Sequence, residues 1–171
     1  MKKIVCLLLA VVMLFCFCAC TDTPAKESGT GSVASNNKKD ETFGLNDTAA
    51  FKTLKFTATE LKETEGTDFF TPEEGNVFVG VKFTIENVSE EEQTISSLLL
   101  FEAYADDVKC DYSFNAACAF SDGTLDGSIS PGKKLVGWYA LEVPENWNSI
   151  ELGVQANFLS NSSAKFVFEN K

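Results

Sequence analysis

The feature of this sequence that most limits its fold is an alternation of apolar and mostly polar residues between positions 77 and 86. The apolar set falls on every second residue: Val77, Val79, Val81, Phe83 and Ile85. Successive side chains of a β-strand point to opposite faces of a sheet, whereas the apolar residues of a surface helix recur every three or four positions. The period of two therefore predicts a strand with one apolar face.

A second alternating run covers residues 135–143 and ends at Pro144, which has no N–H to donate within a sheet. This run is also apolar over part of its other face, which predicts a strand covered on both sides over part of its length. Weaker strand candidates cover residues 54–61, 98–105, 108–114, 150–155 and 165–168.

Turn signals between these segments favour antiparallel connections. Asp106-Asp107 separates two strand candidates as a tight hairpin turn does, and Ser130-Pro131-Gly132-Lys133 places Pro before Gly in the order that a type II turn needs. Seven segments in about 120 residues match the size and strand number of an immunoglobulin-like sandwich. The chain is 44% hydrophobic and contains 15 Phe, which is enough for one packed core. We therefore predict an all-β fold, an immunoglobulin-like antiparallel β-sandwich of about seven strands, over residues 51–171.

The first 20 residues have the order of an export signal. Met1-Lys2-Lys3 is positively charged, residues 4–17 are apolar, and Thr21 begins a polar segment. A membrane-spanning helix needs about 20 apolar residues, so this shorter run predicts a signal peptide over residues 1–19, with an uncleaved amino-terminal anchor as the alternative. Its end, Ala19-Cys20, resembles the lipobox of bacterial lipoproteins, in which the cysteine after a small residue is lipidated. The resemblance implies a lipid on Cys20 and a location at the extracellular face of the cell membrane.

Residues 20–50 are rich in Thr, Ser, Gly, Asn, Asp and Lys, and their only large apolar residues are Val33, Phe43 and Leu45. No apolar period runs through this segment. We therefore predict a flexible polar tether over residues 20–50 that joins the lipid to the folded domain.

Two short motifs and their order give the domain a family resemblance. Gly75-Asn76-Val77-Phe78-Val79 leads into a strand that closes with Glu86-Asn87-Val88-Ser89, and Ser130-Pro131-Gly132-Lys133-Lys134 leads into a strand that ends with Glu142-Val143-Pro144-Glu145. This pattern resembles the telokin-like, immunoglobulin-type domain of unknown function found in secreted lipoproteins of Gram-positive bacteria. The resemblance implies a β-sandwich on a lipidated tether, and it brings no catalytic or binding residues with it.

The charged residues exclude several classes of function. All 14 basic residues are Lys, His is absent, and 25 acidic residues give a net charge of −11. A chain without His builds no Ser-His-Asp or Cys-His nucleophile and lacks the commonest metal ligand. Duplex-binding proteins need clustered cations, which this chain lacks. We therefore expect a protein that is not an enzyme, has no cofactor and binds no nucleic acid.

Two cysteines, Cys110 and Cys118, lie beyond the leader. They have the same parity along the chain, so a hairpin centred near Phe114 would place them opposite each other. The sequence leaves open a disulfide between them or two buried thiols that act as small apolar groups.

Acidic residues cluster in the segments that we predict to be loops. Asp122 and Asp126 lie in the loop from residue 121 to residue 127, where their carboxylates could hold Ca²⁺, although the spacing is not that of an EF-hand. Solvated loop charge is the interpretation of these acids that we favour. Paired loop carboxylates are also the groups that could hydrolyse a glycoside if a cleft held them together.

Trp147 lies in the predicted loop Glu145-Asn146-Trp147-Asn148, where a broad amphipathic side chain suits contact with a partner. Of the two alternatives, a Trp that caps the end of the sandwich is the one that we favour. Our leading hypothesis is a non-catalytic, lipid-anchored binding module of the cell surface, attached to the membrane through Cys20, that contacts an envelope protein or a cell-wall glycan. The alternatives are a small extracellular hydrolase or glycosidase that uses loop carboxylates, and a calcium-stabilised adhesion domain.

Overall fold

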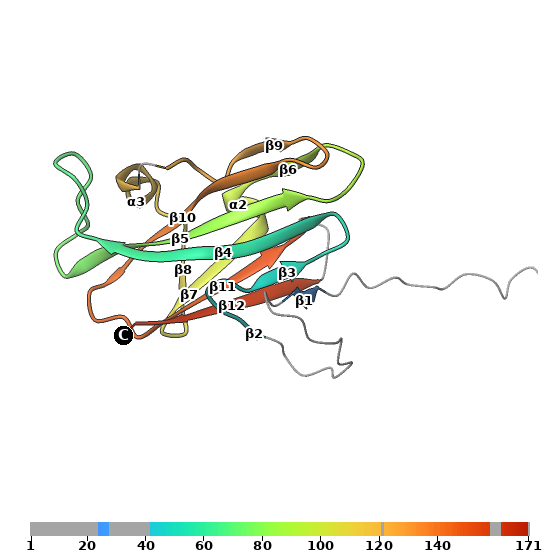
Figure 1. Ribbon diagram of the computed structural model, residues 1–171. Helices are drawn as coiled ribbons and strands as arrows, with labels where there is room; N and C mark the ends of the chain where they lie inside the picture. The colour runs from blue at the N-terminus through green and yellow to red at the C-terminus, as the bar shows by residue number, and fades with distance from the viewer. Residues whose placement is uncertain (1–23, 28–41, 121, 158–161, 171) are drawn as a thin grey trace, which may run out of the picture.

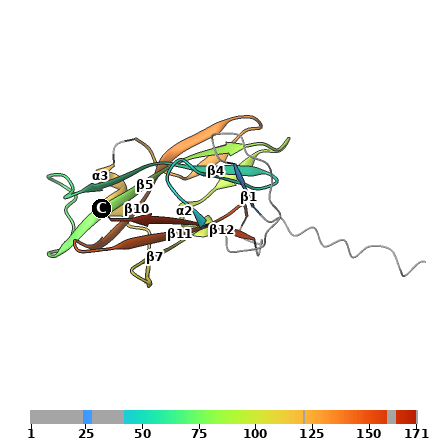
Figure 2. The same cartoon turned by 60° about the horizontal axis from the view of Figure 1, so that its bottom comes forward.

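The computed structural model of the chain describes residues 24–27, 42–120, 122–157 and 162–170. These residues form two five-stranded sheets, one with the strand order β1-β3-β4-β5-β10 and the other with the order β2-β12-β11-β7-β8 (Figure 1). The sheets lie face to face, and the two layers are also distinct when the molecule is turned (Figure 2). The chain is therefore a β-sandwich, as the alternating segments predict.

Three long strands form the centre and one edge of the first sheet: β4 (Leu54–Thr64), β5 (Asn76–Asn87) and β10 (Lys134–Pro144). The short strands β3 (Thr48–Ala50) and β1 (Ala25–Glu27) extend this sheet beyond β4. Burial explains the alternation that predicted β5. Every second residue from Val77 to Ile85 lies in the main core between the sheets.

The second sheet contains β2 (Thr42–Phe43), β12 (Ser163–Glu169), β11 (Ser149–Gln155), β7 (Phe101–Ala105) and β8 (Val108–Cys110). Its strands pair antiparallel, apart from the parallel pair of β2 and β12. A separate ribbon of two strands, β6 (Gln93–Ile95) and β9 (Gly127–Ile129), lies at one end of the sandwich.

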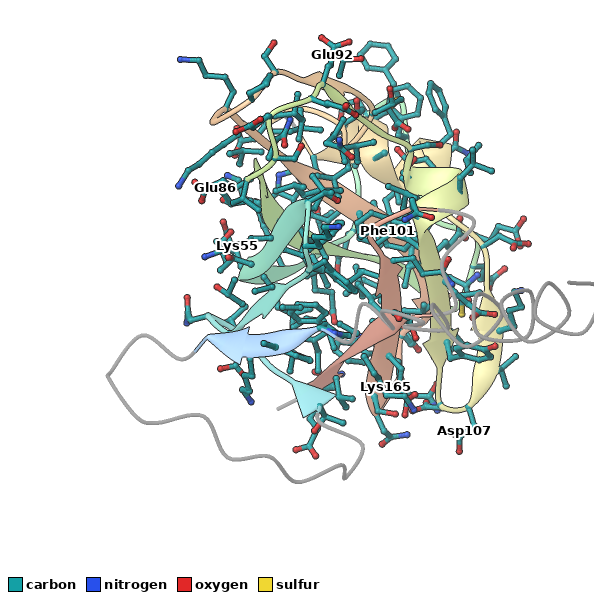
Figure 3. All side chains as sticks on the ribbon, turned by 90° about the vertical axis from the view of Figure 1, so that its right-hand side faces the viewer. Lys55, Glu86, Glu92, Phe101, Asp107 and Lys165 are labelled. Carbon is teal, nitrogen blue, oxygen red and sulfur yellow. The ribbon has the colours of Figure 1, made fainter. Side chains whose placement is uncertain are left out.

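The main core is rich in aromatic side chains. The ring of Phe83 contacts the rings of Phe101 and Phe166 at centroid distances of 5.5 and 5.3 Å, and Phe101 stacks on Tyr139 at 4.8 Å. In Figure 3, Phe101 lies between the layers, whereas Glu86 and other labelled charged residues lie at the margins. Aromatic pairs of this kind add to the burial of apolar area that holds the two sheets together.

A second buried cluster covers the outer face of the first sheet. The helix α3 (Phe114–Ala119) packs on β5 and β10, and its Ala116 and Ala117 join Phe78, Phe120, Trp138 and Ala140 in this cluster. The double covering predicted for residues 135–143 is therefore confirmed, and α3 is the element that provides it.

Both predicted turns are present. Asp106 and Asp107 join β7 to β8 with φ of 47° and 66°, the left-handed conformation that a type I′ hairpin turn requires. Gly132 has φ of 69°, and the N–H of Lys133 donates to the carbonyl of Ser130 at 3.0 Å, as in a type II turn.

Two of the predicted strands are interrupted by helix. The predicted strand 98–105 is helical at its start, where the one-turn helix α2 (Ser97–Leu100) precedes β7. The predicted strand 108–114 is shorter than expected, because β8 ends at Cys110. At Ser113 the hydroxyl accepts the N–H of Ala116 and so caps α3, which starts at Phe114. The hairpin predicted around Phe114 is therefore wrong.

The predicted tether extends too far along the chain. Residues 42–50 contain β2 and β3, and Phe43 and Ala49 are 2% and 0% exposed in the main core. The short length of these two strands hides their alternation in the sequence. The predicted signal peptide, residues 1–19, and Cys20 lie outside the described residues. In the described part of the chain, no helix is both long enough and apolar enough to cross a membrane.

Candidate functional site

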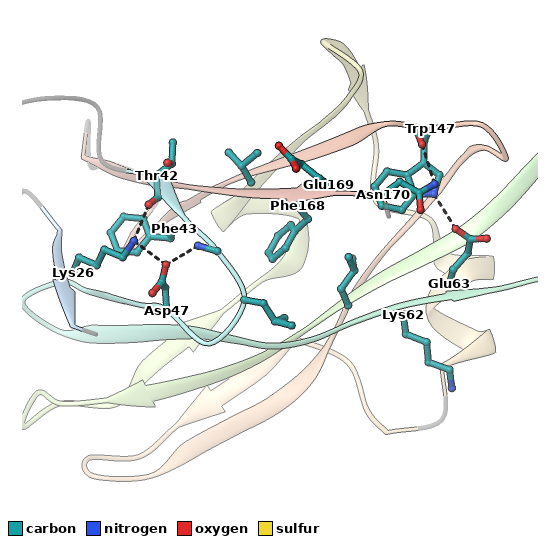
Figure 4. A pocket seen from close by; sticks show the side chains of 14 residues that line it. Lys26, Thr42, Phe43, Asp47, Lys62, Glu63, Trp147, Phe168, Glu169 and Asn170 are labelled. Atoms are coloured by element: carbon teal, nitrogen blue, oxygen red, sulfur yellow. Dashed lines mark hydrogen bonds and ion pairs between the residues drawn. The ribbon is translucent and has the colours of Figure 1, made fainter. Parts of the chain in front are cut away.

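A groove with a volume of about 740 Å³ opens between the two sheets, where β4 of one sheet faces β12 of the other (Figure 4). We call it the inter-sheet groove. Its lining residues come from four strands, β1, β2, β4 and β12, and from the segments that adjoin them: Lys26, Thr42, Phe43, Gly44, Leu45, Asp47, Leu61, Lys62, Glu63, Trp147, Val167, Phe168, Glu169 and Asn170.

The walls of the inter-sheet groove are strand edges. Among the described residues, β3 pairs with β4 only at residues 55–57, so residues 59–64 have β5 as their one neighbouring strand. In the same part of the structure, β2 pairs with β12 only at Lys165 and Phe166, so residues 167–169 have β11 alone. The groove therefore lies where the two short amino-terminal strands stop.

One end of the groove is closed where the chain crosses from the second sheet to the first. The N–H of Gly44 donates to Asp47 Oδ2 at 2.8 Å, and Lys26 Nζ lies 2.8 Å from the same oxygen. Lys26 also donates to the carbonyl of Thr42 at 3.1 Å and lies 5.5 Å from the ring centroid of Phe43. These contacts fix the crossover and connect β1 to it.

Trp147 closes the other end. Its side chain is 3% exposed, and its Nε1 donates to Glu63 Oε2 at 3.0 Å. The Nδ2 of Asn170 donates to the carbonyl of Trp147 at 2.9 Å, and the N–H of Trp147 donates to the carbonyl of Pro144 at 3.0 Å. The loop before β11 is thereby tied to β4, to β10 and to the end of β12.

The floor of the groove is apolar. Phe43 and Phe168 are buried, Leu61 is partly buried against the main core, and Leu45 is 46% exposed. An apolar floor between polar ends is the usual composition of a binding cleft.

The groove is lined by charged residues of both signs. Two lysines (Lys26 and Lys62) and three acids (Asp47, Glu63 and Glu169) line it, for a net charge of −1. Of these acids, Asp47 is paired with Lys26 and Glu63 accepts the Trp147 N–H. A carboxylate held in this way is positioned to fix structure or orient a ligand.

Trp147 is buried and is not the exposed contact that was one of the two interpretations of the sequence. Its ring is in the main core because residues 144–147 turn inward between β10 and β11. This position agrees with the capping alternative, and Trp147 still lines one end of the groove.

Asp122 and Asp126 have separate protein partners. Lys82 Nζ lies 2.8 Å from Asp122 Oδ2, and the hydrogen bond to Asp122 raises the pKa of Lys82. Asp126 accepts the N–H and the hydroxyl of Ser97 and so caps α2. The described residues contain no group of three acidic or thiol side chains able to hold a metal ion. The two carboxylates thus each bond to a protein group, and the structure lends no support to the calcium alternative.

Cys110 and Cys118 are both free thiols. Cys110 is half-buried in β8, where burial raises the pKa of its thiol, whereas Cys118 is exposed on α3. The disulfide is not formed in this structure because a helix replaces the hairpin that would have placed the two residues opposite each other. The alternative of two buried thiols fits Cys110 only in part and does not fit Cys118.

A smaller hollow of about 280 Å³ lies near β7 and β8, and Phe101, Cys110, Tyr112 and Tyr139 are among its lining residues. Burial raises the pKa of both Tyr112 and Tyr139, so these phenols stay neutral at physiological pH. At its rim, hydrogen bonds from Tyr104 and from a lysine lower the pKa of Glu102.

Sequence reasoning missed the contribution of Lys26, Phe43 and Asp47 to the groove, because these residues lie in the segment that we predicted to be a tether. The sequence did contain a signal that this segment is folded. Phe43 and Leu45 are apolar residues two positions apart, and Asn46-Asp47 directly after them is a composition typical of a turn.

The fold and the groove define a class of protein, the antiparallel β-sandwich domain with an open cleft between sheet edges. The chain belongs to the family described as "Domain of unknown function (DUF4352)", whose model matches residues 43–165. That match begins at Phe43, the second residue of β2 and a side chain of the main core. No curated protein matches the chain significantly.

Three solved structures have a similar fold. A protein of Bacillus subtilis subsp. subtilis str. 168, named as a "putative lipoprotein (ycdA)", is 14% identical with a TM-score of 0.57; the match covers 68% of this chain and 36% of that one. An uncharacterized β-sandwich protein of Clostridium difficile 630 is 16% identical with a TM-score of 0.52, over 81% of this chain and 100% of that one. A conserved hypothetical protein of Bacillus anthracis is 14% identical with a TM-score of 0.52, over 75% of this chain and 99% of that one. The chain thus spans about a third of the length of the B. subtilis protein.

Proposed function

We propose that this chain is a non-catalytic binding module of the bacterial envelope, anchored by a lipid on Cys20 at the extracellular face of the membrane, and that the inter-sheet groove contacts an envelope partner. The finer classification that we propose for its sandwich is the telokin-like immunoglobulin type. The observation that carries the binding role is the groove itself, a cleft with an apolar floor between two strand edges.

The anchoring part of the proposal rests on the leader. Residues 4–17 form an apolar run after two lysines, and Ala19-Cys20 ends it with the order of a lipobox. The name of the B. subtilis protein of similar fold, a "putative lipoprotein", supports the same assignment. Acyl chains bury their methylene groups in the bilayer, and two or more of them hold a protein stably. An acidic chain gains nothing from anionic lipid headgroups, so the lipid would be its contact with the membrane.

The non-catalytic part rests on what the groove offers. Its acidic residues Asp47 and Glu63 each have a protein partner, and the chain has no His to serve as a base near pH 7. The proposed activity is therefore recognition, with an envelope protein or a cell-wall glycan as the partner.

Anchoring is tested by expressing Cys20→Ala and the matched control Cys18→Ala in a Gram-positive host and measuring the protein in membrane and medium fractions. We expect the control to stay in the membrane fraction as the unmodified chain does. We expect Cys20→Ala to accumulate as an unprocessed precursor or to leave the membrane. Normal processing and retention of Cys20→Ala would contradict lipidation at this residue.

Binding through the groove is tested by placing a photo-crosslinking p-benzoylphenylalanine at Lys62, which lines the groove, or at Lys109, which lies in β8 away from it. Irradiation of intact cells should give an adduct with an envelope component from the first position and not from the second. Equal adducts from both positions, or none from Lys62, would contradict the proposed contact.

A further inference from the structure

We propose that the inter-sheet groove takes an extended polypeptide segment of a partner protein, which adds as a strand to the free edge of β4. The inference rests on the proposed function and names its class of ligand. That ligand is a peptide with apolar side chains at alternate positions and a net positive charge. Strand addition of this kind derives affinity from main-chain hydrogen bonds and specificity from every second side chain.

The edge of β4 is regular and unoccupied in the described part of the chain. After a bulge between Ala58 and Glu60, residues 60–64 pair with residues 82–78 of β5 without interruption. The carbonyl of Ala58 accepts the N–H of Asn46 at 2.7 Å, so the pairing on the outer side of β4 reaches this residue. Beyond it, the described residues place no strand on that side. In an antiparallel ladder alternate residues direct their N–H and C=O groups to either side. An added strand would therefore find donors and acceptors between residues 60 and 64.

The position of this edge places an added strand inside the groove. Figure 4 shows β4 and β12 along the two sides of the groove, with the lining side chains between them. The strands β3 and β2 occupy the corresponding positions beside β4 and β12 at the closed end, near Lys26 and Asp47. A bound segment would continue the line of β3 along β4. It would thereby cover the open side of the sandwich.

The apolar floor of the groove is the reason to expect apolar side chains at alternate positions of the ligand. Alternate side chains of an extended segment point to the same face, at a spacing of about 3.3 Å per residue along the strand. Those that point inward would meet Leu45 and Leu61, the accessible apolar residues of the lining, whereas the others would face solvent. A volume of about 740 Å³ is within the usual range for a binding cleft and leaves room for several side chains.

Charge favours a basic segment. Lys26 is held by Asp47, which leaves Lys62 with Glu63 and Glu169 among the charged lining residues. The whole chain has a net charge of −11, which attracts a cationic partner and speeds its association.

The aromatic residues of the groove argue against a glycan at this site. Sugars stack on exposed ring faces, but Phe43, Trp147 and Phe168 are only 2%, 3% and 4% exposed. The Nε1 of Trp147 is also already bonded to Glu63. The main-chain groups of the two open strand edges then offer hydrogen bonds to an extended ligand, and the open edge of β4, residues 60–64, is longer than that of β12, residues 167–169.

The probe is a capped heptapeptide in which Lys and Val alternate, titrated into the ¹⁵N-labelled protein and followed by the amide resonances. We expect saturable shifts at Leu61 and Glu63. We expect smaller ones at Val108, which lies on the edge strand β8 outside the groove. The same peptide with alternate amides N-methylated keeps its side chains and charge but loses strand pairing, and it should bind at least about tenfold more weakly.

Two charge reversals complete the test. Glu169→Lys changes an exposed residue of the groove wall and should weaken binding of the unmethylated peptide several-fold, whereas Glu90→Lys makes the same change in an exposed loop outside the groove and should not. Equal binding of the two peptides, shifts spread over the acidic loops, or no saturable shift would each overturn the inference. Shifts of the groove amides on concentrating the protein alone would identify a second copy as the occupant and overturn it too. Groove binding of an N-acetylglucosamine tetramer in place of the peptide would overturn strand addition while leaving the proposed binding module standing.

Discussion

Trp138 and Tyr139 are consecutive residues of β10 that lie in separate buried clusters on opposite faces of one sheet. Tyr139 stacks on Phe101 between the sheets at a centroid distance of 4.8 Å, whereas Trp138 stacks on Phe120 outside them at 4.7 Å. Both side chains are 3% exposed. The first sheet is therefore packed on two sides, with α3 and the chain that follows it as a partial third layer.

This outer layer is sensitive to a single methyl group at Gly80, which lies opposite Ala140. A Cβ at Gly80 would lie 2.8 Å from Phe120 Cζ and 2.9 Å from Trp138 Cε3, closer than real Cβ contacts. We expect Gly80→Ala to force the two stacked rings apart and to lower the free energy of unfolding by about 1–3 kcal/mol. Urea denaturation followed by Trp fluorescence measures the change.

Gly153→Ala is the matched control for this substitution. Gly153 also lies in a central strand, but a Cβ there would meet its nearest atoms, in Glu102, at an ordinary 3.8 Å. Its stability should be unchanged or slightly raised, since alanine restricts the unfolded chain. If Gly153→Ala lost as much stability as Gly80→Ala, the contact with the two rings would not be the cause of the loss in Gly80→Ala.

A buried amide connects the end of β5 to the β6–β9 ribbon. Asn87 is 0% exposed, and its Nδ2 donates to the carbonyls of Glu91 and Ile129 at 2.7 Å each, while its Oδ1 accepts the N–H and hydroxyl of Ser89. We expect Asn87→Ala to cost about 1–3 kcal/mol, because it leaves the buried carbonyl of Ile129 without its side-chain donor. The exposed Asn146→Ala should change the midpoint of a urea transition little, and an equal loss in both variants would contradict this assignment.

The long strands could be predicted from sequence because burial imposes its period on the residues. Val77 and Ile85 are eight residues apart on one strand and both lie in the main core, so the alternation is long enough to be recognised. The hairpin turn at Asp106-Asp107 and the Pro-Gly turn before β10 were predictable for a local reason, since each needs particular residue types.

The groove could not be predicted, because it depends on contacts between segments far apart in the sequence. β2 and β3 contain two and three residues, too few to show a period, and each joins a different sheet. The pairing of Lys26 with Asp47 and of Glu63 with Trp147 spans long stretches of chain. Polar composition alone made residues 42–50 resemble a tether.

The boundary of the domain follows from the burial of Phe43. We expect a chain that begins at residue 42 to unfold cooperatively, and one that begins at residue 51 to lose most of its stability, because it lacks β2, β3 and two core side chains. Phe43→Ala alone should cost about 3–5 kcal/mol, a large part of the stability of a typical domain. Calorimetry of the two shortened chains measures the difference, and equal transitions would show that residues 42–50 contribute nothing to the fold.

Acid should weaken the domain through Asp106, the first residue of the β7–β8 turn. The N–H groups of Ser149 and Asn148 donate to its carboxylate at 2.8 and 3.0 Å, and these hydrogen bonds lower the pKa of Asp106 below its usual 3.8. Because the folded state favours the ionised form, this stabilisation is fully present above the unfolded pKa and is lost as the pH falls through the folded pKa. Asp106→Asn should therefore lower the Tm at about pH 7, and its difference from the unmodified chain should shrink toward about pH 3. Asparagine also accepts the left-handed backbone at this position, where φ is 47°.

The control is Asp107→Asn, which removes one charge from the same turn. An equal pH-dependent loss of Tm in both variants would show that net charge, not the bonds to Asn148 and Ser149, sets the acid response.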